Sequence, residues 1–85
     1  MKKYKKEFND ANIITVTVEL GEVSGNLGDT VVTVRNDAST QWEIKVGRDT
    51  FDTPSRMKIH LTGEAERRQL VAACRYIIQC IEKNS

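Results

Sequence analysis

The sequence predicts an α+β fold: a two-layer sandwich in which an antiparallel four-stranded meander is packed by one long C-terminal helix, in the order ββββα. Three observations predict this fold. Apolar residues between Thr62 and Lys83 recur at the spacing of an amphipathic helix. Four upstream segments alternate apolar and polar residues, as half-buried strands do. Only one helix is available to cover the apolar face that these strands share.

The predicted helix has recognisable ends. Thr62 or Gly63 can serve as its N-cap, and with Gly63 as the cap Glu66 falls at the N3 position of a capping box. Lys83 suits the negative end of the helix dipole. These signals favour a single uninterrupted helix at the end of the sequence.

The apolar side of this helix is unusually wide. At about 100° per residue its centre is formed by Leu70, Cys74, Ile77 and Ile81, and the whole apolar arc is roughly twice what one sheet face requires. Val71 and Ile78 flank the centre on one side. They either reach over the edge of the sheet or contact a second subunit or a partner helix.

The strands are expected from alternation and from the turn residues between them. A glycine-rich hairpin tip is expected at Gly21–Asp29, and Gly47–Arg56 is expected to be irregular. Met1–Phe8 is either a frayed tail or a short edge strand, which would be a fifth strand. The four expected strands are Ile13–Leu20, Thr30–Asn36, Gln41–Val46 and Met57–Thr62.

Length and composition indicate one ordinary globular domain. The chain has 85 residues, of which 39% are hydrophobic and 29% charged, with a formal net charge of +1. We divide it into a basic leader, residues 1–10, and a single domain, residues 11–85. No apolar run approaches the roughly 20 residues of a membrane span, and the N-terminal lysines are not followed by the apolar core of a signal peptide. Two cysteines in one helix, Cys74 and Cys80, point in different directions and favour a reducing cytoplasm.

Catalytic and metal-binding patterns are weak. His60 is the single histidine, and with Glu43 across the sheet it could act as an acid–base pair, but a solvated face of mixed charge explains the same residues. One histidine and two divergent cysteines do not make a tetrahedral metal site. The glycines between Gly21 and Gly28 lack the phosphate-binding spacing and precede a strand. We therefore expect no enzyme activity and no cofactor.

A nucleic-acid-binding domain is the alternative function. Lysines interleaved with aromatic residues can grip phosphates and stack on bases. In the order of elements, Thr30–Lys83 resembles the DNA-binding arm of some phage integrases, whereas the span Asn9–Thr62 holds eight acidic and five basic residues, which would repel phosphates. The residues for this alternative are Lys2, Lys3, Tyr4, Lys5, Lys6, Lys45 and Lys58.

A protein-interaction or regulatory module is the expected function. In size and lack of enzymatic motifs the chain resembles small accessory proteins of enterobacterial phages and prophages, which implies binding to a host protein in the cytoplasm. We expect an unidentified protein partner, a homodimer through the helix flank, and no membrane association. The residues expected at this interface are Val71, Ile78, Arg67 and Phe51.

Overall fold

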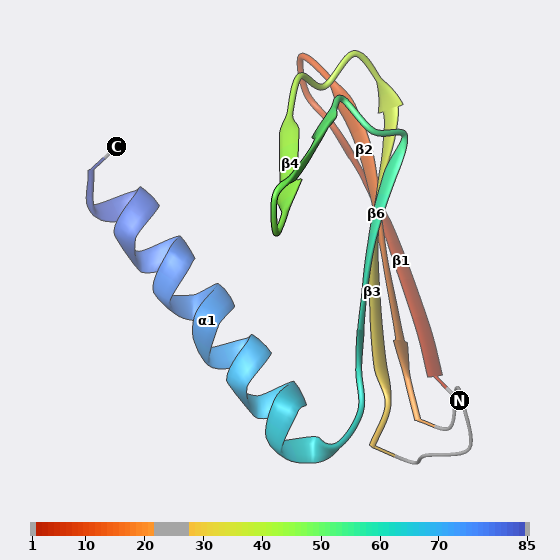
Figure 1. Ribbon diagram of the computed structural model, residues 1–85, viewed down its shortest axis with the longest axis vertical. Coiled ribbons are helices and arrows are strands. Elements are labelled where there is room, and N and C mark those ends of the chain that lie inside the picture. Colours follow the sequence, from red (N-terminus) through yellow and green to blue (C-terminus); the bar gives the residue numbers. More distant parts are fainter. Residues whose placement is uncertain (1, 22–27, 85) are drawn as a thin grey trace.

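Four antiparallel strands form the main sheet, in the order β1-β2-β3-β6 (Figure 1). The computed structural model describes residues 2–21 and 28–84. The sheet contains β1 (Lys2–Asn9), β2 (Ile13–Leu20), β3 (Thr30–Ala38) and β6 (Arg56–Leu61), and α1 (Glu64–Lys83) follows β6. The prediction of an α+β fold with an antiparallel four-stranded sheet and one C-terminal helix is confirmed.

The basic leader is a full edge strand. β1 pairs with β2 along its whole length, from Lys2 opposite Leu20 to Asn9 opposite Ile13. It is thereby the fourth strand of the main sheet. The expected hairpin tip between β2 and β3 lies largely outside the described residues; at its base, the amide of Gly21 donates to the carbonyl oxygen of Asp29 at 3.1 Å.

The placement of Gln41–Val46 in the main sheet was wrong. β4 (Glu43–Val46) instead pairs with β5 (Asp49–Asp52) in a separate hairpin, within the stretch expected to be irregular. Gly47 supplies a positive φ of 61° at the two-residue connection between β4 and β5, a tight turn that favours this local pairing. The hairpin lies on the same side of the sheet as α1 (Figure 1).

The register of the strands divides the sheet into two faces. Val16, Val34 and Met57 form one row across β2, β3 and β6, and Val18, Val32 and Ile59 form the next. We call the face with these rows the inner face; it looks toward α1 and the hairpin. The outer face carries the alternate residues, including the threonines of β2 and His60, as the alternation predicted.

Few hydrophobic side chains are fully buried, and most of those on the sheet are half-buried. Of the hydrophobic residues in the described part of the chain, only Val31, at 4% exposure, is buried, and it belongs to the outer face. The helix has no buried residue. It leaves the lower end of the sheet and runs away from it at an angle (Figure 1). The radius of gyration is 14.2 Å, against roughly 12 Å for a compact chain of this length.

Candidate functional site

An apolar groove separates α1 from the inner face of the sheet. Its volume is about 400 Å³, and its walls are almost entirely hydrocarbon. The sheet side is formed by Val18, Leu20, Thr30 and Val32, and the helix side by Arg67, Leu70, Val71, Cys74, Arg75 and Ile78. Open apolar surface of this kind is typical of a docking site rather than of a catalytic pocket.

The narrow end of the groove is fixed by Arg67. Its Nη2 donates a hydrogen bond to the backbone carbonyl oxygen of Asp29 at 2.8 Å, and its Nε donates one to Oγ1 of Thr30 at 2.6 Å. Arg67 was predicted as an interface residue; the structure places its guanidinium in contacts within the chain. It joins the first turn of α1 to the start of β3.

Two glycines allow the close approach at the same point. A Cβ on Gly28 would lie 3.0 Å from Cα of Gly63, so no larger residue fits there without a backbone shift. Gly63 is the N-cap of α1 and has a φ of 112°, which favours glycine. The chain therefore turns from β6 into the helix in a conformation that only glycine adopts easily.

Val71 and Ile78 line the groove and face the sheet of their own chain. Ile78 is nevertheless 52% exposed, because nothing fills the groove. Cys74, at the centre of the apolar arc, also lines the groove and is exposed, since the helix stands away from the sheet. A further apolar flank, which does not line the groove, carries Tyr76, Ile77 and Ile81, at 67%, 53% and 62% exposure.

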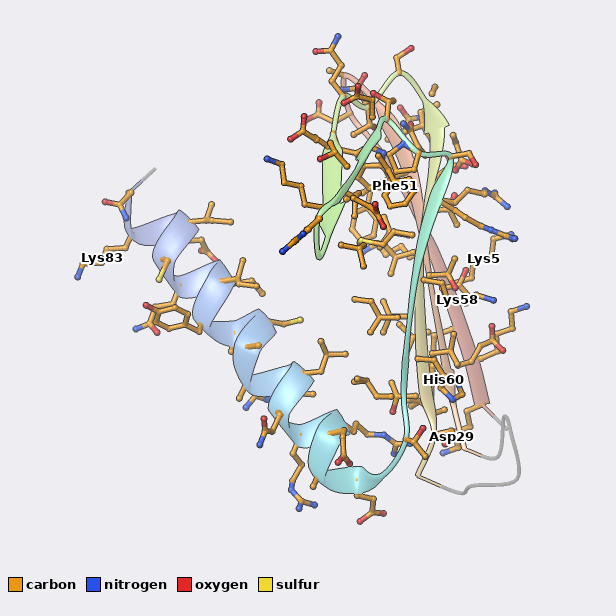
Figure 2. The ribbon with its side chains drawn as sticks, in the orientation of Figure 1. Lys5, Asp29, Phe51, Lys58, His60 and Lys83 are labelled. Carbon is orange, nitrogen blue, oxygen red and sulfur yellow. The ribbon has the colours of Figure 1, made fainter. Side chains whose placement is uncertain are left out.

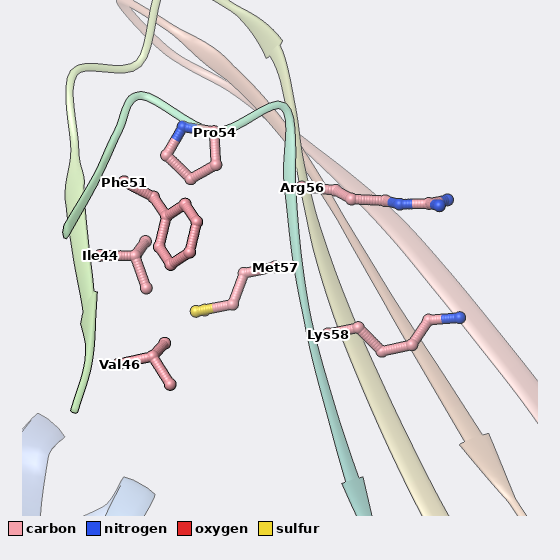
Figure 3. A pocket seen from close by; sticks show the side chains of 7 residues that line it. All are labelled: Ile44, Val46, Phe51, Pro54, Arg56, Met57 and Lys58. Atoms are coloured by element: carbon pink, nitrogen blue, oxygen red, sulfur yellow. The ribbon is translucent and has the colours of Figure 1, made fainter. Parts of the chain in front are cut away.

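Phe51 lies at a different place, between the hairpin and β6. A second pocket of about 270 Å³ is lined by Ile44, Val46, Phe51, Pro54 and Met57, together with backbone near Arg56 and Lys58 (Figure 3). Figure 3 shows Phe51 and Met57 inside this pocket, whereas the side chains of Arg56 and Lys58 point to the other side of the sheet. Phe51 thus lines the space between the hairpin and β6 and does not join Val71 and Ile78.

The outer face is more basic than the sequence indicated. Glu43 and Lys45, which were expected on this face, belong to the hairpin and lie 3.6 Å from each other as an ion pair. In their place, the register brings lysines of β1, among them Lys5 (Figure 2), and Arg56 of β6 (Figure 3) to the outer face. Its basic residues are Lys3, Lys5, Arg35, Arg56, Lys58 and His60, and its acidic residues are Glu7, Glu19, Asp37 and Asp29, of which Asp29 is paired with His60.

The residues predicted for nucleic-acid binding are divided between the two faces. Lys5 and Lys58 lie on one row across the outer face, separated by Thr17 and Thr33. Lys3 is on the same face, in the next row. The remaining leader residues, Lys2, Tyr4 and Lys6, are on the inner face, where Nζ of Lys6 lies 5.1 Å from the ring centre of Phe8.

Three polar contacts connect residues of the outer face. Asp37 accepts hydrogen bonds from Oγ1 of the buried Thr15 and, at 2.6 Å, from Nε of Arg35. These two hydrogen bonds, in that order, hold the pKa of the Asp37 carboxyl below its ordinary value of 3.8. Near the base of the sheet, Nε2 of His60 lies 3.5 Å from Oδ2 of the fully buried Asp29 (Figure 2). The expected partner of His60, Glu43, is in the hairpin and forms no pair with it.

Sequence reasoning missed two parts of these surfaces. The outward positions of Lys3 and Lys5 follow from their alternation, but only if the leader is taken as a strand. The flank with Ile77 and Ile81 was assigned to the sheet contact. Helical periodicity identifies the apolar side of α1, but it does not predict the direction in which α1 leaves Gly63. Within residues 2–21 and 28–84, no cluster of three metal-ligating side chains is present, and no helix is long and apolar enough to cross a membrane.

No protein-family model matches the sequence, and no match is found among curated proteins or among solved structures. The functional conclusion therefore depends on the geometry of the groove and of the outer face alone.

Proposed function

We propose that this chain is a non-enzymatic protein-interaction module whose docking surface is the apolar groove. One observation carries the proposal: the chain exposes 6756 Å², roughly 1,700 Å² more than the roughly 5,100 Å² expected of a 9.6 kDa monomer. Association is the ordinary way in which such surface is removed from water. A protein that fills the groove would complete the two layers, sheet and helix, that the sequence predicts.

The proposal includes the setting in which the module acts. Cys74 and Cys80 are exposed thiols, which persist in a reducing cytoplasm. A short chain with a large apolar docking surface and a polar outer face is suited to bind another protein and either block or adapt it. We include in this proposal that the chain is an accessory protein of a phage or prophage.

The test is a comparison of captured proteins with matched variants of α1. Tagged wild type is co-expressed in bacteria with an untagged copy, and everything retained on the tag is identified by mass spectrometry. Val71→Glu with Ile78→Glu places two charges in the groove. Ala72→Glu with Gln79→Glu adds the same charge to exposed positions of the same helix that do not line the groove.

We expect the wild type and the Ala72/Gln79 variant to retain the same protein, whether a host protein or the untagged copy, and the Val71/Ile78 variant to lose it. Capture that is equal in all three proteins would contradict docking through the groove, as would the absence of any captured protein.

Nucleic-acid binding by the outer face is the second candidate, because the register gathers Lys3, Lys5 and Lys58 on one face. Phosphate contacts from such residues give affinity that falls steeply with salt. Lys5→Ala with Lys58→Ala should weaken retardation of mixed DNA and RNA at low salt. Lys2→Ala with Lys6→Ala, which removes the same charge from the inner face, is the control. Equal behaviour of the two variants would argue against the outer face as the binding surface.

A further inference from the structure

We propose that the occupant of the groove is a second copy of this chain, with each copy placing α1 in the groove of the other about a two-fold axis. This inference deepens the proposed function and rests on it. It names the partner of the apolar groove and makes α1 the exchanged element.

The first argument is the width of the apolar arc on α1. Val71 and Ile78 lie on the side that lines the groove, and Ile77 and Ile81 lie on a neighbouring side, where their side chains are 53% and 62% exposed. A helix that packs only on one sheet needs one apolar side. Two sides are required when a helix lies in a groove whose walls are a helix and a sheet, which is the environment that the groove of a second copy provides.

The second argument is that α1 is obstructed from closing on its own sheet. The clamp of Arg67 on Asp29 and Thr30 fixes its first turn, and Gly28 lies against Gly63. The 20-residue helix is about 30 Å long and an eight-residue strand is about 27 Å long, so a helix that closed on its own sheet would have to lie along the whole inner face. The β4–β5 hairpin already lies over the upper part of the inner face, where Phe51 and Met57 line a pocket between the hairpin and β6 (Figures 1 and 3).

The third argument is area. If each copy removes its excess of roughly 1,700 Å² from water, the pair buries roughly 3,400 Å², which is within the range of obligate homodimers. Each copy offers one groove and one helix, so two copies satisfy both and leave no unfilled groove. A two-fold arrangement closes with two copies, whereas a head-to-tail exchange would continue into a larger ring or a filament.

The first experiment measures the mass of the wild-type protein by light scattering and sedimentation from low to high micromolar concentration. Expected is a mass twice the 9.6 kDa of the chain. A monomer over this whole range overturns the inference. If a host protein is then still captured through the groove, the proposed function stands without the exchange.

The second experiment separates exchange from any other dimer. One variant carries Ile77→Glu with Ile81→Glu on the helix, and another carries Val18→Lys on the inner face. Alone, each variant carries its charged substitution in both helix–sheet contacts of the dimer, so it should be monomeric. In the mixture, a dimer with one copy of each variant has one unaltered helix–sheet contact. In its other contact the two glutamates of one copy face the lysine of the other, so the dimer mass should return. A mixture that stays monomeric overturns the inference.

A third measurement does not depend on charged substitutions that could prevent folding. Both native cysteines are replaced by alanine, and Ile77→Cys is introduced in one chain and Val18→Cys in another. Mild oxidation of the mixture should give a disulfide-linked pair on a non-reducing gel. The control pairs Ile77→Cys with Thr33→Cys, which is on the outer face. Linkage of both pairs to the same extent, or of neither, contradicts exchange.

Discussion

Arg67 in the first turn of α1 donates a hydrogen bond to the backbone carbonyl oxygen of Asp29, across a distance of 2.8 Å. This contact and the neighbouring one to Thr30 join the only helix of the described chain to the sheet. The aliphatic stem of Arg67 also lines the narrow end of the groove. The direction of α1, and with it the shape of the docking surface, therefore depends on a polar clamp rather than on apolar packing.

The clamp predicts the effect of Arg67→Ala. Loss of two hydrogen bonds from a charged donor should lower the free energy of unfolding by about 1–3 kcal/mol, measured by urea denaturation at fixed protein concentration. Arg68→Ala is the control: it removes the same side chain from an exposed neighbouring position and should change stability by less than about 0.5 kcal/mol. Equal losses for the two variants would show that the clamp contributes nothing specific.

Gly28→Ala tests the close approach at the base of α1. Its Cβ would lie 3.0 Å from Cα of Gly63 and 3.1 Å from the amide nitrogen of Glu64, so backbone rather than a flexible side chain must move. We expect faster amide hydrogen exchange in the first turn of the helix. In the matched variant, Gly47→Ala, the new Cβ meets nothing within 4 Å, and its effect should stay within the hairpin. Unchanged exchange in Gly28→Ala would contradict this account.

Periodicity sufficed to predict α1, β2, β3 and β6, because each shows its own pattern. The helix is found between Gly63 and Asn84, within a residue or two of the predicted ends. The inward positions of Val32 and Val34 also follow directly from alternation. These features depend on contacts between near neighbours in sequence or on one shared apolar face.

Pairing partners were harder to predict, for a physical reason. The alternation of Trp42, Ile44 and Val46 shows that this segment has one apolar face, but a two-residue period is the same in a four-stranded sheet and in a separate hairpin. The direction of α1 was hidden for a related reason. It depends on the backbone of Gly63 and on the contacts of Arg67 over 38 residues of sequence, which no local pattern records.

The hairpin gives a prediction for Phe51. Phe51 is 49% exposed and lines the pocket between the hairpin and β6, so Phe51→Ala should lower the free energy of unfolding by about 1–2 kcal/mol, less than for a fully buried ring. Trp42, whose Nε1 donates to the carbonyl oxygen of Pro54 at 2.8 Å, reports on the same region through its fluorescence. Thr50→Ala, at an exposed position of β5, is the control. A spectrum unchanged by Phe51→Ala would place the ring outside the packing of the hairpin.

The lowered pKa of Asp37 predicts that the free energy of unfolding decreases at acidic pH. Its pKa is lowered in the folded chain, first by the hydrogen bond from Thr15 and then by that from Arg35. Because the unfolded chain binds a proton more readily, the stabilisation is fully present above the ordinary value of 3.8 and is lost as the pH falls through the lowered folded value. Asp37→Asn should therefore remove part of the decline in stability below about pH 4, measured by urea denaturation at a series of pH values. Thr15→Val, which deletes the first donor, should move the pKa of Asp37 back toward its ordinary value in an NMR titration of the carboxyl group. A titration midpoint that does not rise in Thr15→Val would mean that the buried hydroxyl does not stabilise the carboxylate, and that Arg35 and Lys5 account for the lowered pKa.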